Sequence, residues 1–226
     1  YKELQYKGET IYNMKHQFFY ELIQTNLRGL KQLIKLVAKF LVSLQSYNMV
    51  HGDLKPANIL VEFDAERTTV LDIRIKDFQS SFKFDELNKV RATSPWYLPP
   101  EVLDYADQRA TNPGQSCQSL KSISSPWSLD VFSLGVTLLE IATGYPVWMS
   151  NKCKATNLLG RSAVGMGIFG VPTKSSAPPS LRSIAAQQVL VIRKLHHNLK
   201  KWDTYGLADN ADFVDLLLTF AWPQNM

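Results

Sequence analysis

One short polar segment holds most of the side chains that could do chemistry. Within six positions it places a carboxylate at Asp53, an ammonium at Lys55 and a carboxamide at Asn58. Together these groups can accept a proton, neutralise phosphate charge and bind a hard cation. Asp77, at the end of a predicted strand, adds a second oxygen ligand for a metal.

The sequence predicts that this segment lies between a helix and a strand. Apolar residues recur at intervals of three and four, which indicates an amphipathic helix that ends near Tyr47. The stripe consists of Leu27, Leu30, Ile34, Val37, Leu41 and Leu44. Two apolar runs, 59–61 and 70–75, flank the polar span 64–69 and predict a hairpin.

A second strong signal predicts a helix in the middle of the core. Ser125-Pro126 is a typical helix start, and residues 129–143 are apolar on nearly all sides. The other expected elements are a short helix near 17–23, amphipathic helices over 184–202 and 211–221, and surface loops over 104–124 and 150–183. The expected fold class is therefore mainly α, a helical bundle with short β hairpins.

Four segments, in this order along the chain, resemble those of the protein kinase superfamily. Residues 51–60 resemble its catalytic loop, and Asp-Phe-Gln at 77–79 is similar to its metal-binding triplet. Residues 93–101 resemble the end of its activation segment, and residues 128–135 resemble its buried central helix. The lysine at position 55 resembles the residue that the serine/threonine branch of the family has at this place in the loop.

The resemblance implies a role for each polar residue. Asp53 would accept or orient the proton of a substrate hydroxyl, and Lys55 would neutralise the phosphoryl group in transfer. Asn58 and Asp77 would hold Mg²⁺ against the phosphates of ATP. Leu60 would lie under the adenine ring, Ser94 would contact both Asp53 and Lys55 and help to recognise the acceptor, and Asp130 would pin the catalytic loop from below.

For the whole chain, the resemblance implies a partial protein kinase domain over residues 1–226. Its parts are a catalytic loop at 51–60, an activation segment at 77–101, an insert at 104–124 that is expected to tune partner choice, and a central helix over about 126–143. The small β lobe and the final helix of the large lobe are expected to be largely absent. The expected function is ATP-dependent phosphorylation of protein Ser or Thr, with these residues alone expected to be inactive. The alternative is an inactive kinase-like binding module.

The sequence departs from the family pattern at three positions near the site. Gly52 stands where the family has an arginine that grips a phosphate of the activation loop, so activation by such a phosphate is not expected. Gln79 replaces the glycine of the metal-binding triplet, where a side chain restricts the backbone. Pro99 replaces a small residue without expected effect. Glu101 is expected to lack the arginine with which the family pairs it.

Composition excludes several other classes. The 226 residues are 45% apolar and 20% charged, which argues against global disorder. No apolar run reaches the ~18–20 residues that span a bilayer. Two cysteines, Cys117 and Cys153, form no disulfide framework and favour a reducing compartment, so we expect an intracellular, cytoplasmic protein.

Two further patterns are not expected to form a binding site. Gly165–Gly170 fits G-x-G-x-x-G but follows no predicted strand and precedes Pro172, so it is not expected to bind phosphate. The net charge of +5 includes a basic run on one predicted helix, without the interleaved aromatic residues of a nucleic-acid surface. That run is Arg193, Lys194, His196, His197, Lys200 and Lys201, and no nucleic-acid partner is expected.

Overall fold

The structure is a computed structural model of the full chain, and it describes residues 9–10, 26–112, 125–143, 180–193, 195–202 and 206–221. The predicted helix near 17–23, the glycine motif at 165–170, Cys117 and Cys153 lie outside the described residues, as do residues 113–124 and 150–179 of the two predicted surface loops. The described part is mainly helical with a few short strands, as the sequence predicts.

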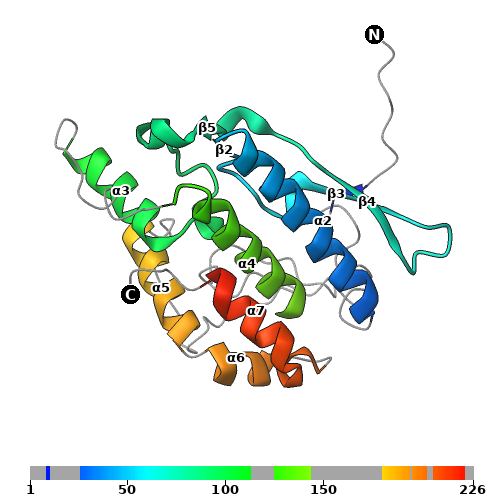
Figure 1. Ribbon diagram of the computed structural model, residues 1–226. Coiled ribbons are helices and arrows are strands. Elements are labelled where there is room, and N and C mark those ends of the chain that lie inside the picture. The colour runs from blue at the N-terminus through cyan, green and yellow to red at the C-terminus, as the bar shows by residue number, and fades with distance from the viewer. Residues whose placement is uncertain are drawn as a thin grey trace, which may run out of the picture.

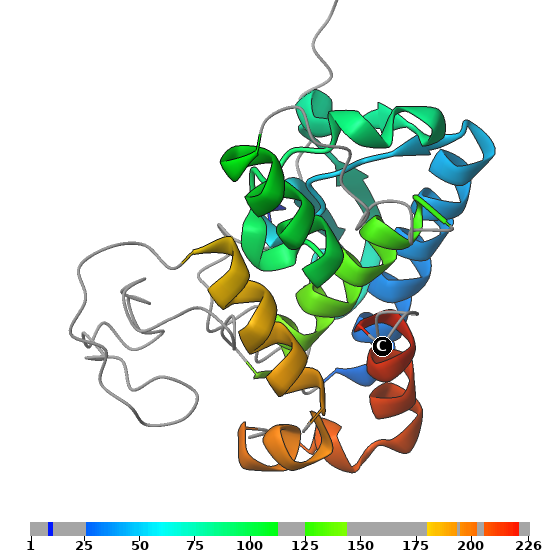
Figure 2. The same ribbon diagram turned by 90° about the vertical axis from the view of Figure 1, so that its left-hand side faces the viewer.

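Helix α4, Ser128–Thr143, is the centre of the fold. In both views it lies between α2, Leu27–Ser46, and α5, Leu181–Arg193 (Figures 1 and 2). Every residue from Phe132 to Thr143 is buried, because α7, Ala211–Ala221, also packs against α4. The prediction of a helix through the middle of the core is therefore confirmed.

Helix α2 begins where Asn26 caps it, its side-chain oxygen accepting a hydrogen bond from the backbone of Gly29 at 3.1 Å. Its buried face differs in detail from the predicted stripe. Leu33 is buried although the stripe omits it, whereas Leu27 at the first turn is 41% exposed. A spacing of three and four cannot decide which of two neighbouring apolar residues faces the core, since both lie within the wide apolar face.

The strands form two small sheets, and the polar segment connects them. Strand β3, Ile59–Phe63, pairs antiparallel with β4, Val70–Ile75, as the predicted hairpin requires. Strand β1, Glu9–Thr10, which the sequence does not predict, adds to the other edge of β3. Strand β2, Met49–Val50, pairs with β5, Phe82–Lys83, so residues 51–58 run from one sheet to the other.

Two predictions about the helices that follow residue 99 are wrong. Residues 104–111 do not form a loop: they continue helix α3, Pro100–Thr111, whose apolar side chains are buried where α3 packs against α5. Tertiary packing thus overrides the polar composition of this helix. The single helix predicted over 184–202 is two, α5 and α6, Leu195–Trp202. None of the helices in the described ranges is both long and apolar enough to cross a bilayer.

Candidate active site

Buried Asp130 on α4 fixes the backbone of the polar segment. Its carboxylate accepts a hydrogen bond from the backbone N–H of His51 at 2.6 Å and another from Gly52 at 3.0 Å. Burial raises the pKa of Asp130, and these two hydrogen bonds oppose that rise because they favour the charged form. A residue of the central helix therefore holds the start of the loop in place.

The His51 ring connects the loop to the strand that precedes Asp77. Its Nδ1 accepts the backbone N–H of Asp53 at 3.2 Å, so its Nε2 carries the proton and donates to the carbonyl oxygen of Lys76 at 3.2 Å. The ring also packs edge-on against Phe78. His51 is fully buried. Its role is thus to position Asp53 and Asp77, without contact with solvent.

The Asp53 carboxylate is the centre of the site. Its Oδ2 accepts hydrogen bonds from Lys55 Nζ at 2.7 Å and from Asn58 Nδ2 at 3.1 Å. Its Oδ1 lies 3.4 Å from the hydroxyl of Thr93. Lys55 Nζ also donates to the Ser94 hydroxyl at 2.7 Å. One ammonium therefore joins the Asp53 carboxylate to the Ser94 hydroxyl.

Asn58 and Asp77 are the two residues that the family resemblance suggests as metal ligands. The amide nitrogen of Asn58 is engaged twice by Asp53, and its side-chain oxygen has no hydrogen-bond donor among the described residues. The backbone N–H of Lys76 donates to the backbone carbonyl oxygen of Asn58 at 3.0 Å, which places Asp77 beside Asn58. Asp77 is exposed, and a left-handed backbone (φ 68°) turns the chain at this residue. Both side chains thus offer oxygen atoms, the ligands that Mg²⁺ takes.

Leu60 lies on β3 next to the site. It is half-buried and sits opposite Arg74 of β4 and Thr10 of β1. The structure therefore places Leu60 on the sheet that follows residues 51–58, but no contact of Leu60 bears on the predicted adenine site. Strand β1 leaves no signal in the sequence because it has only two residues.

The segment that follows Ser94 is fastened by side chains that sequence reasoning missed. The Tyr97 hydroxyl donates to Glu140 at 2.7 Å, and the Ser133 hydroxyl donates to the carbonyl oxygen of Tyr97 at 2.7 Å. From α5, the buried amide of Gln188 donates to the carbonyl oxygen of Leu98 at 2.9 Å. These partners are far apart in sequence, so spacing could not have found them.

Gly52 is required by its backbone conformation. Its φ is +76°, and a Cβ atom here would lie 2.5 Å from the carbonyl oxygen of Ser80. Gln79, in contrast, has no positive φ, so the turn of the triplet is made at Asp77 and tolerates a side chain at 79. The backbone at position 52 therefore has no room for an arginine or for any other side chain.

We expect Gly52→Ala to lower the free energy of unfolding by about 2 kcal/mol or more, because the left-handed conformation alone costs an L-residue ~1–2 kcal/mol. The Ser80 backbone must also move. Gly29→Ala in α2 is the matched control: its Cβ would meet only the Asn26 side chain at 3.4 Å, and alanine favours a helix. Urea denaturation of both variants measures the difference. Equal stability of the two variants would contradict this account of Gly52.

Glu101, near the start of α3, is a partly buried carboxylate without an ion pair among the described residues. Burial raises its pKa above the ordinary value of 4.5, and the neighbouring charge of Asp104 raises it further. The folded protein therefore binds the Glu101 proton more tightly than the unfolded chain does. The resulting stability is fully present below about pH 4.5 and is lost as the pH rises through the raised pKa.

Glu101→Gln is expected to remove this pH dependence. At neutral pH the variant should be more stable than the unmodified protein, because it has no charge to desolvate. Below about pH 4.5 the two should converge. The measurement is the difference in free energy of unfolding between the two proteins at pH 4.5 and at pH 7.5. A difference that does not grow with pH would show that Glu101 is paired or hydrated in the folded state.

Comparison with known proteins gives the family. A sequence model of the protein kinase domain matches residues 11–202, and the chain belongs to this family. Its relatives place it in the serine/threonine branch. A probable serine/threonine-protein kinase fhkA of Dictyostelium discoideum is 35% identical over 125 residues, which cover 51% of this chain and 21% of that protein.

Two longer matches extend over most of the chain. The serine/threonine-protein kinase/endoribonuclease IRE1 of Hypocrea jecorina is 30% identical over 195 residues, 83% of this chain and 14% of that protein. The serine/threonine-protein kinase STK11 of Rattus norvegicus is 24% identical over 190 residues, 76% of this chain and 39% of that protein. The chain spans less than half the length of each of these relatives.

Proposed function

We propose that this chain forms the larger part of a domain that transfers a phosphoryl group from ATP to a Ser or Thr hydroxyl of a protein substrate. The observation that carries the proposal is the position of Lys55 Nζ, 2.7 Å from both the Asp53 carboxylate and the Ser94 hydroxyl. A carboxylate, an ammonium and a hydroxyl thus converge at one point. Phosphoryl transfer depends mainly on such positioning and charge neutralisation.

Each residue of the site has a role in this proposal. Asp53 orients the acceptor hydroxyl and receives its proton, while Lys55 neutralises charge on the group in transfer. Ser94, held by Lys55, positions the acceptor chain. Because Asp53 is only 6% exposed and Lys55 is more accessible, the substrate hydroxyl approaches from the side of Lys55 and Thr93.

Asn58 and Asp77 would hold Mg²⁺, and Leu60 would contact the adenine ring of the nucleotide. ATP, when bound, supplies the phosphoryl group. The side-chain oxygen of Asn58 and the exposed carboxylate of Asp77 support the magnesium assignment, because oxygen atoms without a protein donor are free to bind a hard cation. The protein substrate itself is not specified by these residues.

The test is magnesium-dependent ATP binding by the natural polypeptide that carries this sequence, together with transfer of labelled phosphate to Ser- and Thr-containing peptides. We expect both activities, and we expect Asp77→Ala to weaken MgATP binding at least tenfold because a metal ligand is lost. Asp72→Ala is the matched control, since Asp72 is an exposed carboxylate on the preceding strand β4.

The contrary result also has a definite meaning. A folded protein that neither binds MgATP nor transfers phosphate would be the alternative anticipated from the sequence, an inactive kinase-like binding module. Equal loss in Asp77→Ala and Asp72→Ala would point to a general effect of negative charge and would remove the support for a metal at Asp77.

A further inference from the structure

A second polar site lies beside the active site, in the segment between the metal-binding triplet and Ser94. A pocket of about 400 Å³ opens there, within the range of about 300–1,000 Å³ that small-ligand sites occupy. Its lining contains three cations and several neutral polar side chains and no carboxylate. These residues include Lys89, Arg91, Arg109, Ser80, Ser81 and Asn88.

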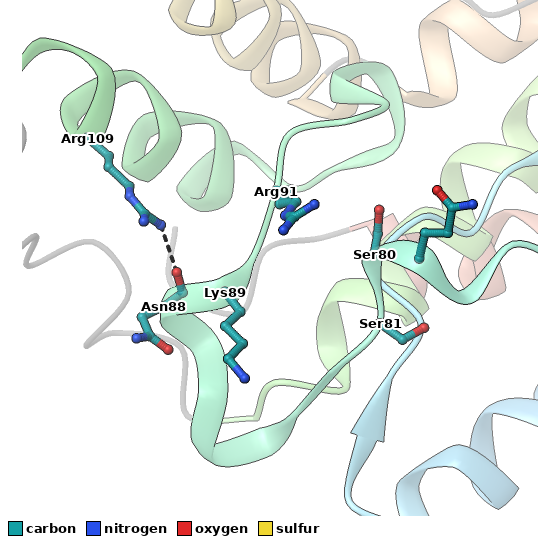
Figure 3. Close-up of a pocket in the computed structure, with 7 residues that line it drawn as sticks. Ser80, Ser81, Asn88, Lys89, Arg91 and Arg109 are labelled. Atoms are coloured by element: carbon teal, nitrogen blue, oxygen red, sulfur yellow. Dashed lines mark hydrogen bonds between the residues drawn. The ribbon is translucent and has the colours of Figure 1, made fainter.

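The three cations differ in how far their charge is already compensated. Lys89 pairs with Glu86 at 2.5 Å, and Arg109 donates to the backbone carbonyl of Asn88 at 2.7 Å. Arg91 is exposed and makes no hydrogen bond or ion pair with any residue that the structure describes. Figure 3 shows its guanidinium between Arg109 and Ser80, so the uncompensated charge faces the pocket.

The pocket is connected to the proposed acceptor position. The Ser80 hydroxyl lies 3.3 Å from that of Thr93, and the Thr93 hydroxyl lies 3.4 Å from Asp53. Arg91 itself precedes Ser94 by three residues. An extended peptide advances about 3.3–3.6 Å per residue. A protein bound with its hydroxyl at Asp53 would therefore bring residues close in its sequence to this pocket.

We propose that this pocket binds an anionic side chain of the protein substrate, a carboxylate or a phosphate, near the acceptor hydroxyl. Arg91 is the main contact, because a guanidinium forms paired, charge-assisted hydrogen bonds with both groups. Arg109 adds positive potential, because its own hydrogen-bond partners are neutral groups. The inference rests on the proposed phosphotransfer function and adds the substrate class to it: peptides that are acidic or already phosphorylated beside the Ser or Thr to be modified.

The test is peptide binding by fluorescence anisotropy, because binding is measurable without catalysis. The probes are peptides with one central Ser, in which Glu, phosphoserine or Gln is placed in turn at each flanking position. We expect Glu or phosphoserine at a confined set of positions to strengthen binding at least fivefold over Gln. Tighter binding of phosphoserine than of Glu would identify phosphate as the ligand, and equal binding would identify a general carboxylate site.

Three variants make the assignment to Arg91 specific. Arg91→Gln should abolish the acid preference, and it should leave thermal unfolding unchanged because Arg91 has no partner among the described residues. Arg193→Gln, an exposed arginine at the end of α5, removes the same charge elsewhere and should keep the preference. Arg91→Glu should reverse the preference toward Lys at the same positions.

Several outcomes would overturn the inference. They are the absence of any acid preference, a preference that survives in Arg91→Gln, and an acid effect that is equal at every position, which would reflect only the net positive charge. Stoichiometric phosphate on Ser80 or Ser81 of the native protein, detected by intact mass, would show that the chain fills the pocket itself. Acid-selective binding without phosphotransfer would refute the proposed function alone, whereas phosphotransfer without acid preference would refute this inference alone.

Discussion

Replacing Asp53 by asparagine is expected to lower phosphotransfer turnover about 10²–10⁴-fold while MgATP affinity stays within about twofold. Asparagine has nearly the same shape, so Asn58 and Lys55 keep their positions, but its amide cannot receive the proton of the acceptor hydroxyl. The measurement is steady-state phosphorylation of a peptide acceptor, with nucleotide affinity determined separately by calorimetry. An unchanged affinity would separate the loss of proton transfer from a loss of binding.

Thr93→Ala is the graded comparison for this prediction. The Thr93 hydroxyl donates to Oδ1 of Asp53 at 3.4 Å, which is a long hydrogen bond. Removing this hydroxyl should therefore lower turnover less than tenfold. If Asp53→Asn retained more than a tenth of the original rate, the carboxylate would serve only to hold Lys55. Lys55 would then become the residue to test.

The largest effect on stability is expected for Asp130→Ala, which should lower the free energy of unfolding by about 2–5 kcal/mol. The substitution leaves the N–H groups of His51 and Gly52 buried without an acceptor, and each such group costs about 1–3 kcal/mol. Asp130→Asn keeps one acceptor oxygen, so its free energy of unfolding should lie between those of the unmodified protein and Asp130→Ala. Denaturant unfolding gives the values directly.

Asp215→Ala on the exposed side of α7 is the control and should change stability by less than about 0.5 kcal/mol. A cost for Asp130→Ala as small as this would mean that another group accepts the two N–H bonds once the carboxylate is gone. Such a result would also predict that residues 51–58 keep their geometry in Asp130→Ala. The phosphotransfer turnover of this variant would then be unchanged.

Local patterns explain how much of the fold the sequence could predict. The periods of α2 and α4 and the polar turn between β3 and β4 are set within one element, so spacing was sufficient for them. The polar residues at 53, 55 and 58 are likewise neighbours along the chain. The helix over 104–111 was missed because its stability comes from contact between α3 and α5, which no local composition records.

The less predictable part of the site depends on contacts that are distant in sequence. The link from Lys55 to Ser94 crosses 39 positions, and family resemblance, not spacing, suggested it. Gln188 reaches the backbone of Leu98 across 90 positions, and nothing in the sequence around it indicates this contact. The proposed anion-binding pocket could not be predicted for the same reason: Arg91 and Arg109 line one pocket only in the folded chain.

The hydrogen bonds from Asp130 have a consequence for synthesis on the ribosome. The acceptor for His51 lies 79 residues later in the chain, and the helix that carries it is covered by α7, which begins only at Ala211. Until Asp130 has emerged and its helix is packed, the backbone N–H groups of His51 and Gly52 therefore lack the acceptor that they have in the folded protein. We infer that the site is among the last parts of this chain to acquire its geometry, so a nascent chain that has not yet released α7 carries all of the site's polar residues without their native arrangement.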